Sequence, residues 1–299
     1  MQTIYATDQG ATQDLYSAEK VLRKNLKQTL DLFYYQLLTI CEITDFSLKY
    51  AEIIKSRHIK LDLEERHYTK IEQHPFVLEL KENEHFKNYV KNNKLAKFID
   101  EGIIRELFRQ LHESHFYKNY MLESGEEVEK EVLLKLYKDV MLTNERYQAH
   151  LEENFTYFDE DNSSVRYRLT DLLETPESLK NSVFFDRLYD KSDADFAIDL
   201  LNNYRNNHQD FEALIKPQLK NWDIQRIARL DIILIKLALC ELLHFDNIPV
   251  KVSINEYIDI SKLYSTPKSH EFVNGVIDRL RKKLEKEKKI KKSGRGLLS

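Results

Sequence analysis

Residues 221–280 read NWDIQRIARLDIILIKLALCELLHFDNIPVKVSINEYIDISKLYSTPKSHEFVNGVIDRL, and their apolar pattern decides the fold. In the first half of this stretch, apolar side chains recur three and four positions apart along one helix face: Ile227, Leu230, Leu234, Leu237 and Leu242. Ile224, Ile233 and Leu239 widen that face. Because a helix that is apolar on so many sides must be buried, we predict that this helix forms the centre of a core.

The second half of the stretch carries signals for two further helices. Pro249 ends the central helix, because proline cannot donate the backbone hydrogen bond that continuation requires. Residues 253–256, Ser-Ile-Asn-Glu, have the form of a capping box and predict a helix start. Thr266-Pro267 predicts the start of the last helix, which contains Gly275. Since glycine inside a helix costs roughly 1 kcal/mol relative to alanine, we expect another backbone to pack closely there.

Composition favours an all-α fold for the whole chain. The 299 residues include only 6 glycines and 5 prolines, whereas an average chain of this length would carry roughly 21 and 15. Charged residues make up 32% and hydrophobic residues 42%, a mixture that suits amphipathic helices rather than sandwiches or barrels.

Amphipathic helix patterns also cover most of the chain before residue 221. Apolar residues spaced three and four apart predict one very long helix, or two consecutive helices, over residues 19–57. The same pattern predicts helices in four further places: 86–122, 126–152, about 193–208 and 209–220. The aromatic and acidic segment NFTYFDEDNSS, residues 154–164, is expected to form a loop.

Charge is distributed unevenly along the chain, although its net value is only −4. Residues 216–299 hold 18 Lys and Arg against 10 Asp and Glu, whereas residues 1–215 hold 28 against 40. We therefore expect an anionic partner to be attracted to the C-terminal part.

The chain is expected to be a soluble protein of a reducing cytoplasm. Its most apolar run, residues 232–240, is interrupted by Lys236 and is too short to cross a bilayer, and no signal-peptide pattern is visible. Cys41 and Cys240 lie inside helical apolar patterns, which favours small buried side chains over a disulfide.

Several elements of residues 221–280 resemble the C-terminal half of NusB-type transcription antitermination factors. The resemblance is carried by the order and spacing of 246–249 (DNIP), 254–256 (INE) and 269–280 (SHEFVNGVIDRL). Residues 193–219 resemble the helical hairpin that precedes these elements in the family. The resemblance implies an all-helical protein that binds single-stranded boxA RNA together with NusE, a small-subunit ribosomal protein. It also implies assembly into the RNA polymerase antitermination complex on ribosomal RNA operons.

In this interpretation the fold is all-α, with a NusB-like helical bundle in the C-terminal third and an additional long-helix domain inserted after the first helix. The predicted organisation has four parts: a remnant of the first NusB-like helix (1–10), a lineage-specific helical insertion (11–192), the NusB-like helical domain (193–285) and a basic flexible tail (286–299).

The start of the chain resembles the second half of the family's first helix, in QTIYATDQ at residues 2–9. In the family, the first half of that helix is rich in arginine and contacts RNA, whereas the first basic residue here is Lys20. We expect Met1 to lie in mid-helix, either because the true start is upstream or because the arginine-rich piece has been lost. Each lost phosphate contact weakens RNA binding, because fewer counterions are released.

The resemblance places candidate RNA-binding residues at the start of the last helix and in the loop before it: Tyr264, Lys268 and Phe272. Ser269 and His270 are further candidates from their position in the chain. An exposed aromatic ring can stack on an unpaired base, and a nearby lysine can neutralise a phosphate. The alternative for Tyr264 and Phe272 is that they pack a helix–helix corner. Ser269 and His270 lie in the first helical turn, where the positive helix end favours an anion. For His270, a structural hydrogen bond is the alternative to an RNA contact.

Other candidates lie outside that loop. The resemblance places an acidic NusE-facing residue near Asp231, which must be either exposed at an interface or paired internally, because an unpaired buried carboxylate is costly. Lys282 and Lys283 belong to a basic run of at least nine positive side chains from Arg281 to Arg295, which favours nonspecific RNA attraction or a solvated tail. Trp222 is expected to be a core anchor.

Nothing in the sequence favours catalysis, a cofactor or a metal. The chain lacks HExxH, CxxC, P-loop and dinucleotide-binding motifs, and no serine lies in a nucleophile-elbow context. His112 and His115 are expected to be solvated surface residues rather than metal ligands. We therefore expect a protein that is not an enzyme.

The main functional hypothesis is a transcription antitermination factor that binds boxA-type RNA and NusE. Its rival is a helical protein-interaction module that binds NusE but has lost specific RNA binding with the arginine-rich N-terminus. A weaker third possibility is the NusB-like domain of ribosomal RNA cytosine methyltransferases, which would require a catalytic domain with a reactive cysteine after residue 299.

Overall fold

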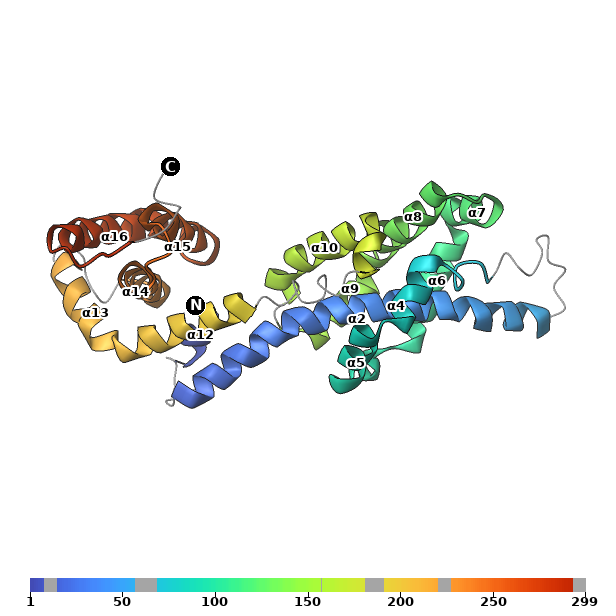
Figure 1. Ribbon diagram of the computed structural model, residues 1–299, viewed down its shortest axis with the longest axis horizontal. Helices are drawn as coiled ribbons and strands as arrows, with labels where there is room; N and C mark the ends of the chain where they lie inside the picture. Colours follow the sequence, from blue (N-terminus) through green and yellow to red (C-terminus); the bar gives the residue numbers. More distant parts are fainter. Residues whose placement is uncertain (8–14, 57–68, 157, 181–190, 220–226, 293–299) are drawn as a thin grey trace. The chain divides into compact units, whose positions relative to one another are not determined.

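The computed structural model describes residues 1–7, 15–56, 69–156, 158–180, 191–219 and 227–292, and these residues are 84% helical with no strand among them. The predicted all-α fold is confirmed (Figure 1). The chain divides into two compact units, which we call the terminal unit (Met1–Lys24 and Lys191–Ser299) and the inserted unit (Asn25–Asp190). Predictions on residues 8–14, 57–68, 157, 181–190, 220–226 and 293–299, Trp222 among them, lie outside the described residues.

The terminal unit contains α1 (Gln2–Ala6), the first residues of α2 (Leu15–Ser56), α12 (Lys191–Asn206), α13 (His208–Ile215), the 3₁₀ turn η5 (Lys216–Leu219), α14 (Arg229–His244), α15 (Val250–Tyr264) and α16 (Ser269–Lys286). Its centre is α14, which α1, α12, α13, α15 and α16 all contact. Eleven of the sixteen residues of α14 are buried. The prediction of a central buried helix is therefore confirmed.

Three charged side chains of α14 are buried, and each has a polar partner. Lys236 Nζ donates to Glu212 Oε1 at 2.8 Å and lies 2.9 Å from His208 Nε2. Glu241 Oε2 accepts a hydrogen bond from Tyr257 at 2.9 Å. Asp231 is paired with a serine described below. These contacts compensate the cost of removing charge from water, so a largely aliphatic core can contain them.

The inserted unit contains the rest of α2 and the following elements: α4 (Pro75–Glu82), α5 (Glu84–Asn92), η2 (Leu95–Phe98), α6 (Glu101–Glu113), α7 (His115–Leu122), α8 (Glu126–Lys135), the π-helical turn η3 (Leu136–Met141), α9 (Glu145–Asn154), α10 (Phe158–Glu174) and η4 (Pro176–Lys180). The 42-residue α2 confirms the predicted long helix. Gly125, at a φ of 154°, lies between α7 and α8, at the boundary between the predicted helix patterns 86–122 and 126–152.

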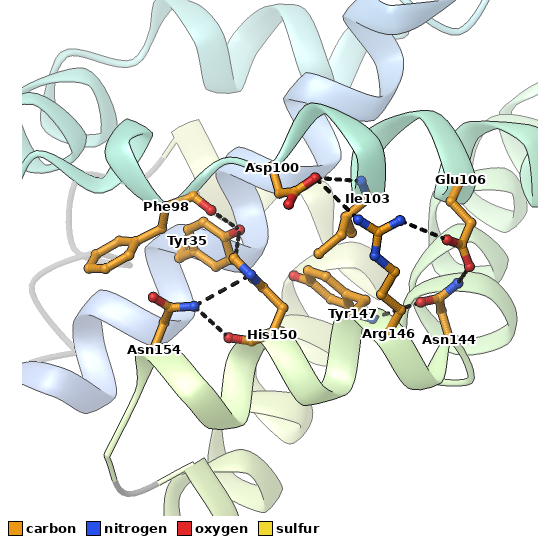
Figure 2. Close-up of polar contacts among 10 residues, drawn as sticks. All are labelled: Tyr35, Phe98, Asp100, Ile103, Glu106, Asn144, Arg146, Tyr147, His150 and Asn154. Atoms are coloured by element: carbon orange, nitrogen blue, oxygen red, sulfur yellow. Dashed lines mark hydrogen bonds and ion pairs between the residues drawn. The ribbon is translucent and has the colours of Figure 1, made fainter.

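Polar contacts between α2, α6, α9 and the turn η2 lie inside the inserted unit (Figure 2). The hydroxyl of Tyr35 donates to the carbonyl of Phe98 at 3.1 Å and lies 2.9 Å from His150 Nε2. Asn144 caps α9 through the N–H of Tyr147 at 2.7 Å, and its amide donates to Glu106 at 2.9 Å. Tyr35 thus satisfies a carbonyl at the end of η2, and Asn144 satisfies an N–H at the start of α9 while its amide joins that start to α6.

The expected loop at residues 154–164 is the first of three local expectations that are wrong. The segment 154–164 is not a loop throughout, because α10 begins at Phe158. Asn162 lies in that helix and accepts a hydrogen bond from Arg166 at 3.1 Å, and the helix buries Val165 and Leu169. Packing of this apolar stripe outweighs the weak helix propensity of the Asp and Asn residues.

The predicted capping box at 253–256 lies one turn inside α15. The helix begins after Pro249, and the N–H of Ser253 already donates to the Pro249 carbonyl at 3.1 Å. Close backbone packing at Gly275 is also absent among the described residues. A methyl group added there would lie 3.6 Å from Arg279 Nη1, an ordinary contact with a flexible side chain.

Both cysteines are free and buried, as the sequence predicted. Burial raises the pKa of the Cys41 and Cys240 thiols to about 12, so neither is a reactive thiolate at neutral pH. No helix among the described residues is long and apolar enough to cross a membrane.

Candidate nucleic-acid and partner interface

The loop between α15 and α16 is fastened by hydroxyl groups to the starts of α14 and α16. Ser265 Oγ donates to Asp231 Oδ1 at 2.6 Å. Ser269 Oγ lies 2.9 Å from Ser265 Oγ and 2.7 Å from Thr266 Oγ1. Because Ser265 and Ser269 are directly hydrogen-bonded, the backbone of this loop is held in one conformation, and so are the positions of the neighbouring side chains.

Asp231 is 3% exposed and is paired with Ser265. Of the two alternatives for this carboxylate, internal pairing is therefore the one in the structure. Asp231 lies in the first turn of α14, where a negative side chain interacts favourably with the helix dipole. A role for Asp231 in binding a partner protein stays a prediction.

Three predicted RNA-binding side chains reach the surface at this corner. Tyr264, the last residue of α15, is 44% exposed. Lys268 is exposed at the N-cap position of α16, and His270 is half-buried in the first turn. The structure therefore brings together an aromatic ring, a cation and an imidazole around one helix start.

The remaining predicted RNA-binding residues are either buried or lie farther along α16. Ser269 is buried within the hydroxyl cluster, and Phe272 is 7% exposed and belongs to the core of the terminal unit. Lys282 and Lys283 lie fourteen and fifteen residues after Lys268 on α16, which corresponds to about 21 Å along the helix axis. Lys282 pairs with Asp278 at 2.7 Å. These two lysines do not join the corner.

A cavity of about 500 Å³ opens beside Tyr264 within the terminal unit. Its wall includes Tyr5 from α1, Arg229 and Leu230 from the start of α14, and Ser265 from the loop. Tyr5 is 39% exposed and Arg229 is also exposed. Sequence reasoning named neither Tyr5 nor Arg229, although the resemblance of residues 2–9 to a first NusB-like helix pointed to the segment that carries Tyr5.

The C-terminal basic segment is partly fastened to α14. Lys292 Nζ donates to the carbonyls of Glu241 at 3.0 Å and Phe245 at 2.8 Å, which lie at the C-terminal end of α14. Ile290 packs against the core of the terminal unit. Burial lowers the pKa of Lys292. This lysine stabilises a helix end, where carbonyl groups lack helical partners.

Charge separates the two units. The terminal unit holds 23 Lys and Arg against 18 Asp and Glu, a net charge of +5. The inserted unit holds 23 against 32, a net charge of −9. An anionic ligand is therefore attracted by the terminal unit and repelled by the inserted unit.

The geometry gives no metal site among the described residues, since no three His, Cys, Asp or Glu side chains there are grouped to hold an ion. His112 is not the solvated surface histidine that the sequence predicted. Its ring is half-buried against Tyr50, with ring centroids 4.9 Å apart, and burial lowers its pKa. His115 is exposed.

Comparisons with known proteins identify the family. The model of the NusB family matches residues 159–282, which extend from within α10 of the inserted unit into α16. No solved structure matches the chain significantly.

Three curated relatives are each named transcription antitermination protein NusB. The protein from Salinibacter ruber is 42% identical over 109 residues, which are 36% of this chain and 68% of that protein. The Chloroherpeton thalassium protein is 41% identical over 104 residues, covering 35% of this chain and 49% of its own length. The Listeria monocytogenes protein is 39% identical over 83 residues, covering 28% and 65%.

The family-model match, residues 159–282, includes residues 193–280, in which the sequence resemblance was found. Proteins of this family are not enzymes, which agrees with the expectation for this chain. The identity to the Salinibacter ruber protein over more than two thirds of that protein's length, together with the family-model match, shows that the chain belongs to the NusB family.

Proposed function

We propose that this protein is a transcription antitermination factor that binds boxA-type single-stranded RNA together with ribosomal protein NusE in ribosomal RNA operons. Family membership is the observation that carries the proposal, because the three curated relatives bear the antitermination name. The mechanism is positioning: joint binding of nascent RNA by the two proteins holds them near RNA polymerase in the antitermination complex.

RNA binding is assigned to the corner between α15 and α16. Tyr264 is exposed enough to stack on an unpaired base, and Lys268 can neutralise a phosphate beside it. His270 lies where the free N–H groups of the first turn of α16 favour an anion. Ser269 and Phe272 hold the start of α16 in place, Ser269 through its hydrogen bonds to Ser265 and Thr266 and Phe272 through its packing in the core. Lys282 and Lys283 add sequence-independent attraction.

The binding of NusE is assigned to the cavity beside Tyr264 and to the start of α14. Tyr5, Tyr264 and Arg229 are of the residue types enriched at protein interfaces, where rings and guanidinium groups fill pockets. Asp231 fixes the loop that forms one wall of this cavity through Ser265. A partner that fills the cavity would lie directly beside the RNA-binding corner, which explains joint recognition.

The domain organisation is part of the same proposal. Residues 1–10 and 193–285 supply the NusB-like bundle, residues 11–192 are an insertion, and residues 286–299 are a basic tail. The family model begins at residue 159, upstream of the proposed bundle. The insertion is proposed to contact a further component of the antitermination complex.

Fluorescence anisotropy tests the proposal with a labelled boxA-like RNA and a scrambled control, each titrated with the protein alone and with NusE present. Selective binding that tightens with NusE is the expected result. Equally weak binding of both RNAs with a steep salt dependence, alongside intact NusE binding, would replace the proposal with the protein-interaction module.

Two substitutions locate the RNA contact. Tyr264→Ala is expected to weaken boxA binding by about 5- to 150-fold, the equivalent of about 1–3 kcal/mol for one stacked base. Tyr167→Ala is the matched control, because Tyr167 is 74% exposed on α10 of the inserted unit. Lys268→Gln is expected to reduce the slope of log affinity against log salt by about 0.7, the value for one phosphate on single-stranded RNA.

A further inference from the structure

The inserted unit carries a small groove between α4, α8 and η4. Its volume is about 270 Å³. Phe76, Leu133 and Leu173 form part of its lining and are each buried, while Pro75 and Pro176 add two rigid residues. This lining is apolar and is built from α4, α8, α10 and η4, four elements of one compact unit, so its shape is set by the packing of that unit.

The rim of the groove is acidic. Glu79, Glu126, Glu129 and Glu177 face a single lysine, Lys130. Lys130 Nζ lies 3.2 Å from Glu126 and 3.7 Å from Glu177 and thus bridges α8 to η4. Within the part of the chain that the structure describes, no ion pair engages Glu79.

The other polar groups at the rim leave its negative charge in place. Glu129 Oε2 accepts a hydrogen bond from the Tyr120 hydroxyl at 3.1 Å, a neutral donor. His74 Nδ1 accepts the N–H of Phe76 at 3.2 Å, and its Nε2 lies 2.8 Å from the Glu129 carbonyl oxygen and 3.4 Å from the carboxylate oxygen Oε2 of the same residue. A histidine with one nitrogen accepting and the other donating is neutral. Four carboxylates therefore face one cation.

We propose that this groove binds the side chain of an arginine or lysine from a basic segment of a partner protein. The apolar floor suits the methylene stem, and Glu79 and Glu129 are available to the charged end. A groove of about 270 Å³ falls below the usual range of about 300–1,000 Å³ for small-molecule sites and suits one anchoring side chain. The net charge of −9 on the inserted unit draws a basic partner and repels nucleic acid.

This inference does not rest on RNA binding by the terminal unit. It gives the inserted unit a partner of opposite charge to the ligand proposed for the terminal unit. The two activities can therefore be tested separately in the same full-length protein.

The probe is N-acetyl-arginine amide, titrated into the isotopically labelled full chain and followed by backbone amide chemical shifts. The matched control compound is N-acetyl-citrulline amide, which has nearly the same shape but no charge. We expect saturable shifts at residues of α4, α8 and η4 with the arginine compound and much smaller shifts with the citrulline compound. Equal shifts with both compounds, or shifts spread over the acidic surface without saturation, would overturn the proposal.

Two variants make the test specific. Glu79→Gln is expected to weaken arginine binding by about threefold, as for one partly exposed charge pair. Glu82→Gln is the control, because Glu82 is an exposed residue of the same helix that does not line the groove. Lys130→Gln is expected to tighten binding, because it removes the competing cation from Glu126 and Glu177.

The gain expected for Lys130→Gln protects the test against simple loss of folding, since a damaged groove would not bind more tightly. Equal affinities for Glu79→Gln and Glu82→Gln, or weaker binding by Lys130→Gln, would contradict the proposal. All three variants are expected to bind boxA-like RNA as the unsubstituted protein does, so failure of the groove would be distinguishable from failure of RNA binding.

Discussion

The terminal unit and the inserted unit fill their cores with different chemistry. In the terminal unit, α14 buries a largely aliphatic surface against helices on several sides. The core of the inserted unit contains six tyrosines that are less than 2% exposed: Tyr34, Tyr35, Tyr117, Tyr120, Tyr137 and Tyr147. Aliphatic packing needs mainly the correct helical period, whereas a buried hydroxyl group costs free energy unless it finds a partner at a defined position.

The largest expected effect tests the aliphatic half of this comparison. Leu234→Ala removes a side chain that is 0% exposed at the centre of α14 and is expected to destabilise the terminal unit by about 2–5 kcal/mol. Leu230→Ala, at a half-buried position of the same helix, should cost much less. Hydrogen exchange at amides of α15 and α16 measures both losses. Equal losses would show that α14 is not the centre of this core.

A smaller effect separates two buried tyrosines of the inserted unit. Tyr35→Phe leaves the Phe98 carbonyl and His150 without their hydroxyl partner, so we expect a cost of about 1–3 kcal/mol. Tyr117→Phe is the control, because within the described residues the buried Tyr117 hydroxyl has no hydrogen-bond partner, and its removal should be nearly neutral. Denaturant unfolding of the two variants decides between them. Similar costs would mean that burial of the ring alone, rather than hydroxyl pairing, stabilises this core.

A still smaller change should stabilise the terminal unit. Gly275→Ala places a methyl group where only the flexible Arg279 side chain comes near, and it removes the helix penalty of glycine. The expected gain is about 1 kcal/mol. Thermal unfolding monitored by circular dichroism measures it. A decrease in stability would instead indicate that another backbone packs closely against Gly275, as the sequence suggested.

The last prediction concerns a loss of stability that is absent at neutral pH and develops as the pH is lowered. Burial lowers the pKa of His74, which caps α4 in its neutral form. Because the pKa is lower in the folded state than the unfolded value of 6.5, stability is complete above that pH and falls as the pH drops from there toward the folded-state pKa. Hydrogen exchange at α4 between pH 7.5 and 5.5 should show this loss. A His74→Asn variant with the same pH dependence would assign it to another group.

The sequence alone determined the all-α class, the central place of α14 and the family. These features follow from side-chain periodicity, scarce glycine and proline, and the ordered elements between residues 246 and 280, all of which are local in the chain. The start of α10 was missed because Asp and Asn weaken a helix signal that burial of Val165 and Leu169 restores.

Only the tertiary structure decided which candidate residues share a surface. Tyr264, Lys268 and His270 are near neighbours in sequence, but Tyr5 and Arg229 join Tyr264 only through the packing of α1 and α14. Burial of Asp231 and Phe272 and the contact of Lys292 with α14 likewise depend on helices far apart in the chain. Periodicity identifies the apolar face of a helix, but the neighbouring helix determines which polar side chains are covered and which remain available to a partner.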